Sequence, residues 1–276
     1  YEQMNGNVSG FMREFPMTFE EAFQSAEGKL IDSVILNNAI LSPTVPDLSQ
    51  PKILGVDPAG DGDRTALVYR QGYYMNDYET FNHMDAQTLA NIILDRIDRK
   101  QVDHVFIDMG YGHGTYDILR GKCHITGVHF GGRANNPMLY EDKRSEMAGE
   151  FKDWMSEGPD SMGGTARISS KKEFIDDIRV IPELEFTTKR KFKLAPKVEI
   201  KKELKRSPDL FDAGILTFAH PVRTRRHAMG TQGQFQQGER KSMLTTNQQF
   251  QDFQQADQAQ TYKQNPNFQY YNYPKR

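Results

Sequence analysis

The sequence predicts an α/β fold in which helices cover a mixed β-sheet. Between about residues 50 and 225, short apolar stretches typical of buried strands occur together with amphipathic stretches of helical period. The first three strands follow one another directly, whereas the later ones alternate with helices. A three-strand meander followed by such an alternation indicates a mixed sheet that is covered on its faces.

The predicted elements follow in order along the chain. Expected strands are residues 52–57 (KILGVD), 66–71, 73–80, 102–109 and 124–130. Expected helices are residues 85–100, 115–121, 141–158, 171–180 and 208–220. Asp85 is the predicted cap of the first helix, and the last begins with Ser207 as N-cap and Pro208 at its first position. Gly214 costs that helix about 1 kcal/mol relative to Ala, which suggests a close approach to the sheet.

The two ends of the chain differ from this central part in composition. Residues 1–48 are expected to form a lead-in segment, with an amphipathic helix that starts at Thr18. From Thr231 onward the chain holds 13 Gln and 4 Asn in 46 residues, with Leu244 as its only Leu, Ile or Val. Such a segment cannot bury enough aliphatic surface to offset its ordering entropy. We therefore expect a folded domain at 49–228 and a disordered polar tail at 229–276.

Composition also excludes several classes of protein. No apolar run approaches the roughly 18 residues that span a bilayer, and no signal peptide is visible. The single cysteine, Cys123, excludes an internal disulfide framework and a cysteine-based zinc site. We expect a soluble protein of a reducing compartment, taken as the cytoplasm, without a membrane partner.

Two predicted strands end in an aspartate that a Gly-rich turn follows at once. Asp57 precedes Pro58 and Gly60, and Asp108 precedes Gly110. Taken singly, such an aspartate is more often a turn former or a helix cap. Together they deliver two carboxylates to the edge of an α/β sheet at which ligands usually bind.

The last predicted helix adds Asp209 and Asp212, which lie on one helix face because they are three residues apart. Two carboxylates about 4 Å apart repel by about 4 kcal/mol at an effective dielectric of 20, so such a cluster needs a cation or raised pKa values. A site of carboxylates alone selects Mg²⁺ or Mn²⁺. Two such ions, about 3.5 to 4 Å apart and bridged by Asp57, could hold a phosphate group between them, one activating water and the other stabilising a leaving oxygen.

The basic residues cluster in one part of the chain, although the net charge is only −2. Between Thr187 and Arg206, nine Lys or Arg stand against Glu199 and Glu203. This composition is typical either of a solvated helix or hairpin face or of a nucleic-acid track, and the sequence leaves both open. The candidate DNA-binding residues are Lys189, Arg190, Lys191, Lys193, Lys201, Lys202, Lys205 and Arg206.

Five stretches, in this order, carry a resemblance to a known family: REFPMTFEEAFQ, GVDPAGDGDRTAL, VFIDMGYGHGTYDILR with ITGVHFGG, LYEDKRSEMAGEFKDWM, and KRSPDLFDAGILTFA. Together they resemble the large subunit of the tailed-phage DNA-packaging terminase, specifically its C-terminal nuclease domain with an RNase H-like fold. The resemblance extends to about His220.

This resemblance implies metal-binding catalytic carboxylates at Asp57, Asp108 and Asp209, with Asp212 as a fourth metal ligand. It leaves the roles of Asp63 and His113 open. It further implies an endonuclease that uses two Mg²⁺ or Mn²⁺ ions to cut concatemeric phage DNA in the host cytoplasm. The implied partners are double-stranded DNA, the phage portal, the small terminase subunit and an ATPase domain upstream in the full-length chain.

Two other functions remain open at this stage. GVDPAGDGDRTAL and IDMGYGHGT also resemble the phosphate-binding loops of actin-like sugar kinases and chaperone ATPases. Those proteins need a later Gly-Gly adenosine loop, whereas the corresponding region here is basic and is followed by SPDLFDA. The second alternative is a non-catalytic module that clamps DNA or docks to the portal and whose acidic edge is only structural.

Overall fold

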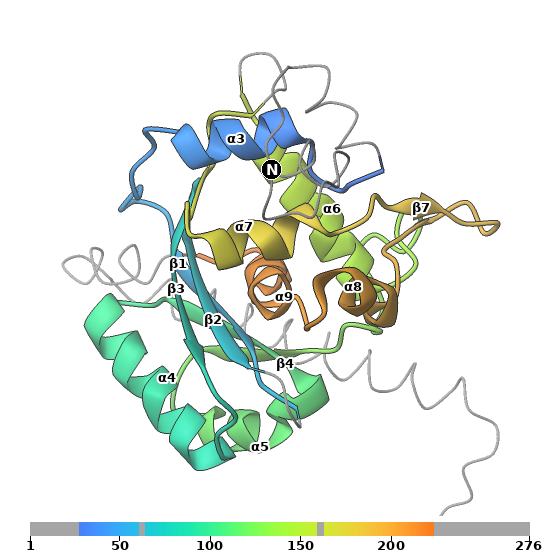
Figure 1. Ribbon diagram of the computed structural model, residues 1–276. Helices are drawn as coiled ribbons and strands as arrows, with labels where there is room; N and C mark the ends of the chain where they lie inside the picture. Colours follow the sequence, from blue (N-terminus) through green and yellow to red (C-terminus); the bar gives the residue numbers. More distant parts are fainter. Residues whose placement is uncertain (1–27, 61–63, 159–162, 224–276) are drawn as a thin grey trace, which may run out of the picture. The chain divides into compact units, whose positions relative to one another are not determined.

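The computed structural model describes residues 28–60, 64–158 and 163–223, and everything stated below concerns these residues (Figure 1). The chain divides into two units, residues 1–225 and 226–276, and the second lies wholly outside the described residues. The predicted helix from Thr18 and the predicted polar tail lie outside them too.

A mixed sheet with the strand order β5-β4-β1-β2-β3-β6 forms the centre of the described unit (Figure 1). The strands are β1 (Lys52–Asp57), β2 (Thr65–Gln71), β3 (Tyr74–Phe81), β4 (His104–Asp108), β5 (Ile125–Val128) and β6 (Arg167–Ile168). The first three pair as an antiparallel meander, whereas β4 joins β1, β5 joins β4, and β6 joins β3 in parallel. The predicted mixed α/β sheet is therefore confirmed.

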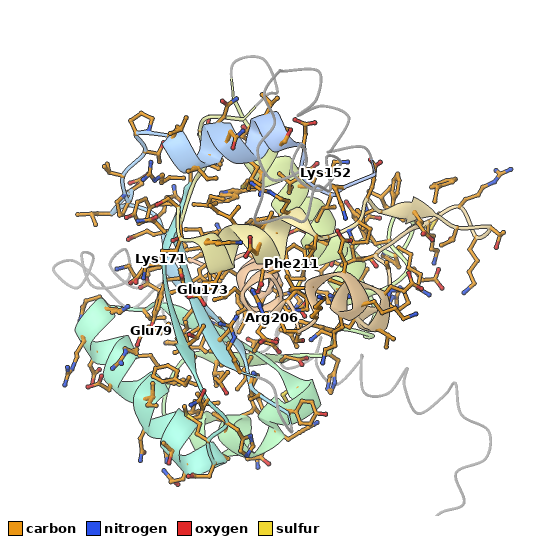
Figure 2. All side chains as sticks on the ribbon, in the orientation of Figure 1. Glu79, Lys152, Lys171, Glu173, Arg206 and Phe211 are labelled. Carbon is orange, nitrogen blue, oxygen red and sulfur yellow. The ribbon has the colours of Figure 1, made fainter. Side chains whose placement is uncertain are left out.

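Helices cover both faces of this sheet. They are α3 (Ser33–Leu41), α4 (Ala86–Lys100), α5 (Met109–Leu119), α6 (Lys143–Ser156), α7 (Lys172–Arg179), α8 (Lys197–Leu204) and α9 (Asp209–Leu216). On one face α4 and α5 pack on Leu54, Leu67 and Ile107. On the other, α9 lies against the sheet with α6 and α7 beside it, and α3 packs on α6 and β6. Phe211 of α9 is fully buried in this second core (Figures 1 and 2).

The close contact between α9 and the sheet depends on a glycine of β1. A Cβ atom at Gly55 would lie only 1.9 Å from the carbonyl oxygen of Ala213, so no larger residue fits without moving the helix. At Gly214 an added Cβ would lie 3.5 Å from Met75 Sδ, which is an ordinary contact. The predicted close approach is present, but the glycine that permits it stands on the strand.

Both ends of α9 are held by side chains from other elements. At the carboxyl end, Arg70 of β2 donates to the carbonyl oxygen of Thr217 at 2.7 Å and to its Oγ1 at 3.0 Å. At the amino end the N-cap residue is Pro208, whose side chain makes no capping hydrogen bond. The predicted cap by Ser207 is therefore wrong. Asp177 of α7 takes that role, because its Oδ2 accepts the Leu210 N–H at 2.9 Å.

Several elements differ from the prediction. Helix α5 begins at Met109, directly after Asp108, because its glycines serve packing rather than a turn: a Cβ at Gly112 would lie 2.8 Å from Ile107 Cγ1. The sequence did not predict α3, although Leu36 and Ala39 of the expected lead-in are buried in the core. The basic stretch forms both a hairpin, β7 (Glu185–Phe186) with β8 (Phe192–Lys193), and the helix α8. None of the helices in the described ranges has the length and apolar character needed to cross a membrane.

Candidate metal and nucleic-acid site

The fold brings the four predicted aspartates together at one edge of the sheet. Asp57 ends β1 and Asp108 ends β4, its parallel neighbour, while Asp209 and Asp212 lie in the first turn of α9. All four side chains are buried, since their residues are 5%, 8%, 4% and 0% exposed in that order. The charges of the other three all act on Asp57, which is therefore the centre of the cluster.

The surroundings of Asp57 disfavour its negative charge. Burial raises the pKa of Asp57 well above its ordinary value, and the carboxylates of Asp212, Asp108 and Asp209 raise it further. Lys197 acts in the opposite direction, but its Nζ atom is 3.8 Å from Asp57 Oδ2. Burial likewise raises the pKa of Asp108, against the influence of Lys197 and the Gly110 N–H. A carboxylate pair with raised pKa values would be relieved by a nearby multivalent cation.

Asp212 is the best neutralised of the four aspartates. Its Oδ1 accepts hydrogen bonds from Arg144 Nε at 3.0 Å and from Arg144 Nη2 at 2.9 Å. Its Oδ2 lies 2.7 Å from Lys197 Nζ in an ion pair. Burial opposes ionisation of Asp212, but Arg144 and Lys197 hold its pKa below the ordinary value.

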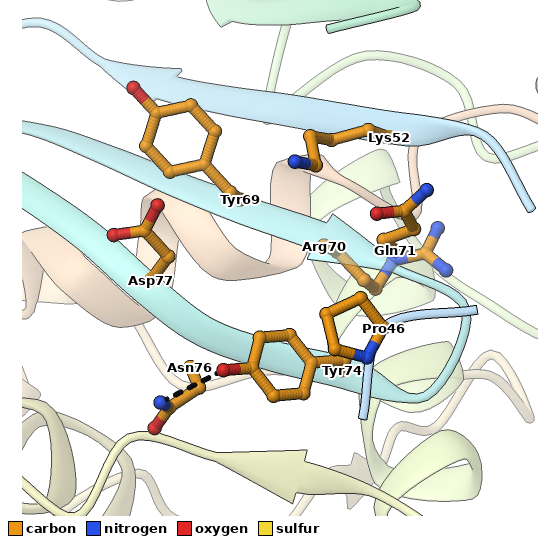
Figure 3. A pocket seen from close by; sticks show the side chains of 8 residues that line it. All are labelled: Pro46, Lys52, Tyr69, Arg70, Gln71, Tyr74, Asn76 and Asp77. Carbon is orange, nitrogen blue, oxygen red and sulfur yellow. Dashed lines mark hydrogen bonds between the residues drawn. The ribbon is translucent and has the colours of Figure 1, made fainter. Parts of the chain in front are cut away.

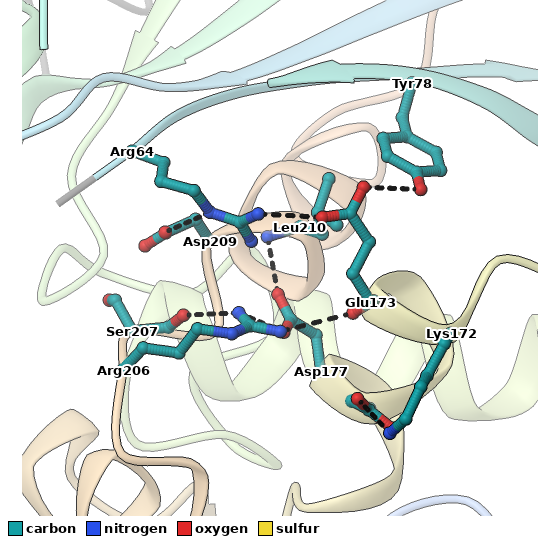
Figure 4. A network of polar contacts seen from close by, with 10 residues as sticks. Arg64, Tyr78, Lys172, Glu173, Asp177, Arg206, Ser207, Asp209 and Leu210 are labelled. Carbon is teal, nitrogen blue, oxygen red and sulfur yellow. Dashed lines mark hydrogen bonds and ion pairs between the residues drawn. The ribbon is translucent and has the colours of Figure 1, made fainter. Parts of the chain in front are cut away.

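Asp209 faces another cation. Arg64, the residue before β2, places its Nε atom 3.6 Å from Asp209 Oδ2 (Figure 4). Sequence reasoning missed Arg64, Arg144 and Lys197 as members of the site. Lys197 lies in the basic stretch, and Arg64 and Arg144 lie in two of the stretches that carry the family resemblance, but nothing in the sequence paired any of them with an aspartate.

The oxygen-only donors of the cluster fit a hard divalent cation, and their crowding favours one. Across the described ranges, no three His, Cys, Asp or Glu side chains stand ready as a complete set of metal ligands. The ammonium of Lys197 and the guanidinium groups of Arg64 and Arg144 lie beside these carboxylates and balance part of their negative charge.

The predicted basic residues lie in three places. Lys189 and Arg190 form the turn of the hairpin, with Lys191 and Lys193 beside it, and the hairpin projects from the body of the unit (Figure 1). Lys201, Lys202 and Lys205 lie on α8 and its C-cap. Arg206 is instead paired with α7, where its Nη1 lies 2.5 Å from Oδ1 of the buried Asp177.

The remaining candidates are Asp63 and His113. Asp63 lies outside the described residues. His113 is exposed on α5, with its ring 5.9 Å from that of His129, which follows β5. His129 itself acts electrostatically on Asp108, so these two histidines border the cluster.

A hollow of about 350 Å³ lies at the opposite end of the sheet (Figure 3). It is lined by Pro46, Lys52, Tyr69, Arg70, Gln71, Tyr74, Asn76 and Asp77. Lys52 and Gln71 are paired across β1 and β2 five residues away from the Asp57–Ala66 pair, so the hollow is separate from the carboxylates. None of the predicted site residues lines it.

Comparison with solved structures reveals the same fold in phage proteins. The nuclease domain of the large terminase subunit gp2 of bacterial virus Sf6 superposes with a TM-score of 0.57 and 19% identity, over 70% of this chain and 100% of that domain. A mutant of that domain with manganese and beta-thujaplicinol gives a TM-score of 0.57 at 18% identity, with the same coverage. The large terminase nuclease from thermophilic phage G20c with bound magnesium gives 0.50 at 13% identity, over 71% of this chain and 98% of that one.

No protein-family model and no curated protein sequence matches the chain. The likeness is thus one of structure, and it agrees with the strand order and with the helices on both faces. The described chain has the RNase H-like fold of the nuclease domain of phage large terminase subunits.

Proposed function

We propose that this protein is a metal-dependent endonuclease that cuts concatemeric phage DNA during genome packaging. The observation that carries the proposal is the convergence of four buried aspartates from β1, β4 and α9 at one edge of a terminase-nuclease fold. Such a cluster is unfavourable without cations, and an all-oxygen cluster selects the hard divalent ions that phosphodiester hydrolysis uses.

In this proposal Asp57, Asp108 and Asp209 would hold two Mg²⁺ or Mn²⁺ ions. When bound, the ions would supply an activated water and charge stabilisation at the leaving 3′ oxygen. Asp212 would be the fourth ligand through Oδ2 if the Lys197 ammonium, 2.7 Å from that atom, gave way, since Arg144 holds Oδ1 with two hydrogen bonds. The chain orients the carboxylates through Arg144 and Arg64 and keeps most water away from them by burial.

The DNA duplex is held by the exposed lysines and arginine of the hairpin and of α8. Lys193 at the end of β8 is four residues before Lys197, whose ammonium contacts Asp212, so the basic track leads from the surface to the carboxylates. Contacts with phosphate groups position a duplex without reading its sequence. Arg206 stabilises α7 rather than joining this track in the free protein, because it is paired with Asp177.

The packaging role follows from the kind of protein whose domain shares the fold. Those domains belong to large terminase subunits by their descriptions, and one is described with manganese and another with magnesium. We extend this to the other partners of packaging, namely the portal, the small terminase subunit and an upstream ATPase domain. The site of action is then the cytoplasm of the infected host.

Cleavage of supercoiled plasmid tests the proposal. We expect nicked and linear DNA with Mn²⁺ or Mg²⁺, and no product with a chelator. Asp57→Asn should abolish cleavage but keep DNA binding, measured by fluorescence anisotropy with a labelled duplex. Asp98→Asn is the matched control, because Asp98 is exposed on α4 and lies outside the cluster.

The outcomes separate the alternatives. DNA binding without cleavage by the wild-type protein in either metal would favour the non-catalytic clamp. Hydrolysis of ATP without DNA cleavage would favour the actin-like ATPase. Equal cleavage rates for Asp57→Asn and wild type would show that the carboxylate cluster does not take part in catalysis.

A further inference from the structure

Arg64 occupies an unusual position between the carboxylate cluster and α7. Its backbone is fixed at the start of β2, next to Thr65, whose Oγ1 accepts the Ala59 N–H at 3.0 Å. Its side chain extends toward α9, where Nε lies 3.6 Å from Asp209 Oδ2 (Figure 4). The guanidinium group therefore connects the edge of the sheet that holds Asp57 with the helix that holds Asp209.

The orientation of Arg64 is set from its far side. Nη1 of Arg64 donates to Glu173 Oε2 at 2.8 Å, and Glu173 Oε1 accepts the Tyr78 hydroxyl at 2.7 Å (Figure 4). Tyr78 belongs to β3 and packs on Phe174 of α7, with ring centroids 5.4 Å apart. The arginine is thus held by a carboxylate that is itself anchored on the sheet.

The backbone next to Asp209 is held by α7 as well. Asp177, fully buried, accepts the Leu210 N–H at 2.9 Å and pairs with Arg206 at 2.5 Å. Two residues of α7 that are one turn apart therefore act on the first turn of α9: Asp177 on its backbone and Glu173, through Arg64, on the Asp209 side chain.

The guanidinium group of Arg64 is not fully used by these contacts. Its Nε and Nη2 atoms are buried and have no hydrogen-bond partner among the described residues. The 3.6 Å separation from Asp209 is an ion pair and too long for a hydrogen bond. Buried donors in this condition are rare in folded proteins and often mark a position under functional constraint.

We propose that Arg64 is a positioning residue that orients the Asp209 carboxylate for metal binding, with Glu173 setting the angle of its guanidinium group. The inference rests on the proposed function, because it assigns Arg64 a role toward the cations of that site. Groups that orient a ligand without touching the metal typically change metal affinity by about 10- to 100-fold when they are replaced.

Calorimetric titration of Mn²⁺ into the full chain without DNA tests this role independently of cleavage. Arg64→Gln should raise the Kd for Mn²⁺ about 10- to 100-fold. Arg64→Lys should give a smaller rise, because lysine keeps the charge but cannot contact Glu173 and Asp209 with one planar group. Glu173→Gln leaves both Arg64 and Asp209 in place and should shift the affinity in the same direction.

Arg96→Gln is the matched control. Arg96 is 24% exposed and pairs with Glu79, while Arg64 is 28% exposed and pairs with Glu173, so both variants lose a comparable arginine–glutamate pair. Arg96 lies on α4, on the other face of the sheet, and its variant should bind Mn²⁺ with the wild-type Kd.

Plasmid cleavage measured against Mn²⁺ concentration completes the test. In Arg64→Gln we expect the half-saturating concentration to rise by the same factor as the Kd, with the maximal rate largely restored at saturation. A Kd within twofold of wild type would overturn the proposal, as would lost cleavage at saturating Mn²⁺ with unchanged affinity, which would make Arg64 a direct DNA contact. A wild-type chain that neither binds Mn²⁺ nor cleaves DNA would instead refute the proposed function.

Discussion

Replacing Gly55 with alanine should separate α9 from the sheet. The new Cβ atom would lie 1.9 Å from the Ala213 carbonyl oxygen and 3.2 Å from Leu216 Cβ, whereas ordinary contacts begin at 3.4 Å. Since both the strand and the helix present backbone here, α9 has to withdraw by about 1.5 Å. Overpacking of a core costs about 1–3 kcal/mol, and we expect about 3 kcal/mol at this position because no flexible side chain can yield.

The same displacement would act on the candidate site, because α9 carries Asp209 and Asp212. A misplacement of about 1 Å can lower a rate about 100-fold, so Gly55→Ala should lose most Mn²⁺-dependent plasmid cleavage even where it is folded. Urea unfolding followed by circular dichroism measures the stability. Gly214→Ala is the control: its Cβ would meet Met75 Sδ at 3.5 Å, and the higher helix propensity of alanine should add up to about 1 kcal/mol.

The reasoning fails if Gly55→Ala unfolds within about 0.5 kcal/mol of wild type, the range of neutral surface substitutions, and cleaves DNA at the wild-type rate. Loss of cleavage in Gly214→Ala together with normal behaviour of Gly55→Ala would mean that the helix glycine, and not the strand glycine, sets the distance.

Three further predictions follow from the charges. Lys197→Met should bind Mn²⁺ about 30-fold more tightly in calorimetry, because the Lys197 ammonium no longer occupies the Asp212 carboxylate. Unit charges 2.7 Å apart interact by about 1.5 kcal/mol in water and about 6 kcal/mol at a dielectric of 20, and the 34% exposure of Lys197 favours a value of about 2 kcal/mol. Weaker Mn²⁺ binding by this variant would contradict the prediction. Burial raises the pKa of Glu79, but hydrogen bonds from Arg96, Lys100 and Tyr69 outweigh this effect and lower the pKa from 4.5 to about 2. The stabilisation by the ionised Glu79 is present above pH 4.5 and is lost as the pH falls toward 2. At pH 7 the free energy of unfolding of Glu79→Gln should therefore be about 1–2 kcal/mol lower than that of wild type, after allowance for solvent screening, whereas at pH 2 the two should be equal. A stability difference that persists at pH 2 would be inconsistent with this assignment. Replacing Lys201 and Lys202 together by Gln should reduce the slope of log affinity against log salt by about 2 in DNA-binding titrations, and an unchanged slope would remove α8 from the track.

The order of strands and helices could be predicted because each element carries its own periodic pattern. The strand from Lys52 to Asp57 and the helix capped by Asp85 have the predicted bounds to within a residue. The grouping of the aspartates was also predictable, since the ends of parallel strands share one edge of a sheet. In contrast, Gly110 and Gly112 predicted a turn at the position where α5 begins, because glycine has a low helix propensity. Close packing of Gly112 against Ile107 favours the helix instead.

The partners of the aspartates could not be predicted, because they depend on tertiary contacts between distant segments. Arg144 and Asp212 are 68 positions apart, and the cap of α9 comes from Asp177 rather than from the adjacent Ser207. A buried arginine and an exposed one look the same in a single sequence. Only the packing of α6 and α7 on α9 distinguishes them.

The two-ended attachment of α9 limits how this acidic motif could be transferred to another scaffold. A designer who grafted SPDLFDAGIL alone would leave behind Arg70, which binds its carboxyl end, and Asp177, which binds its amino end. The graft would also need a strand glycine at the crossing point. Because Arg144 and Lys197 also neutralise the buried Asp212, a portable unit would have to contain β1, β2, α6, α7, α8 and α9 together.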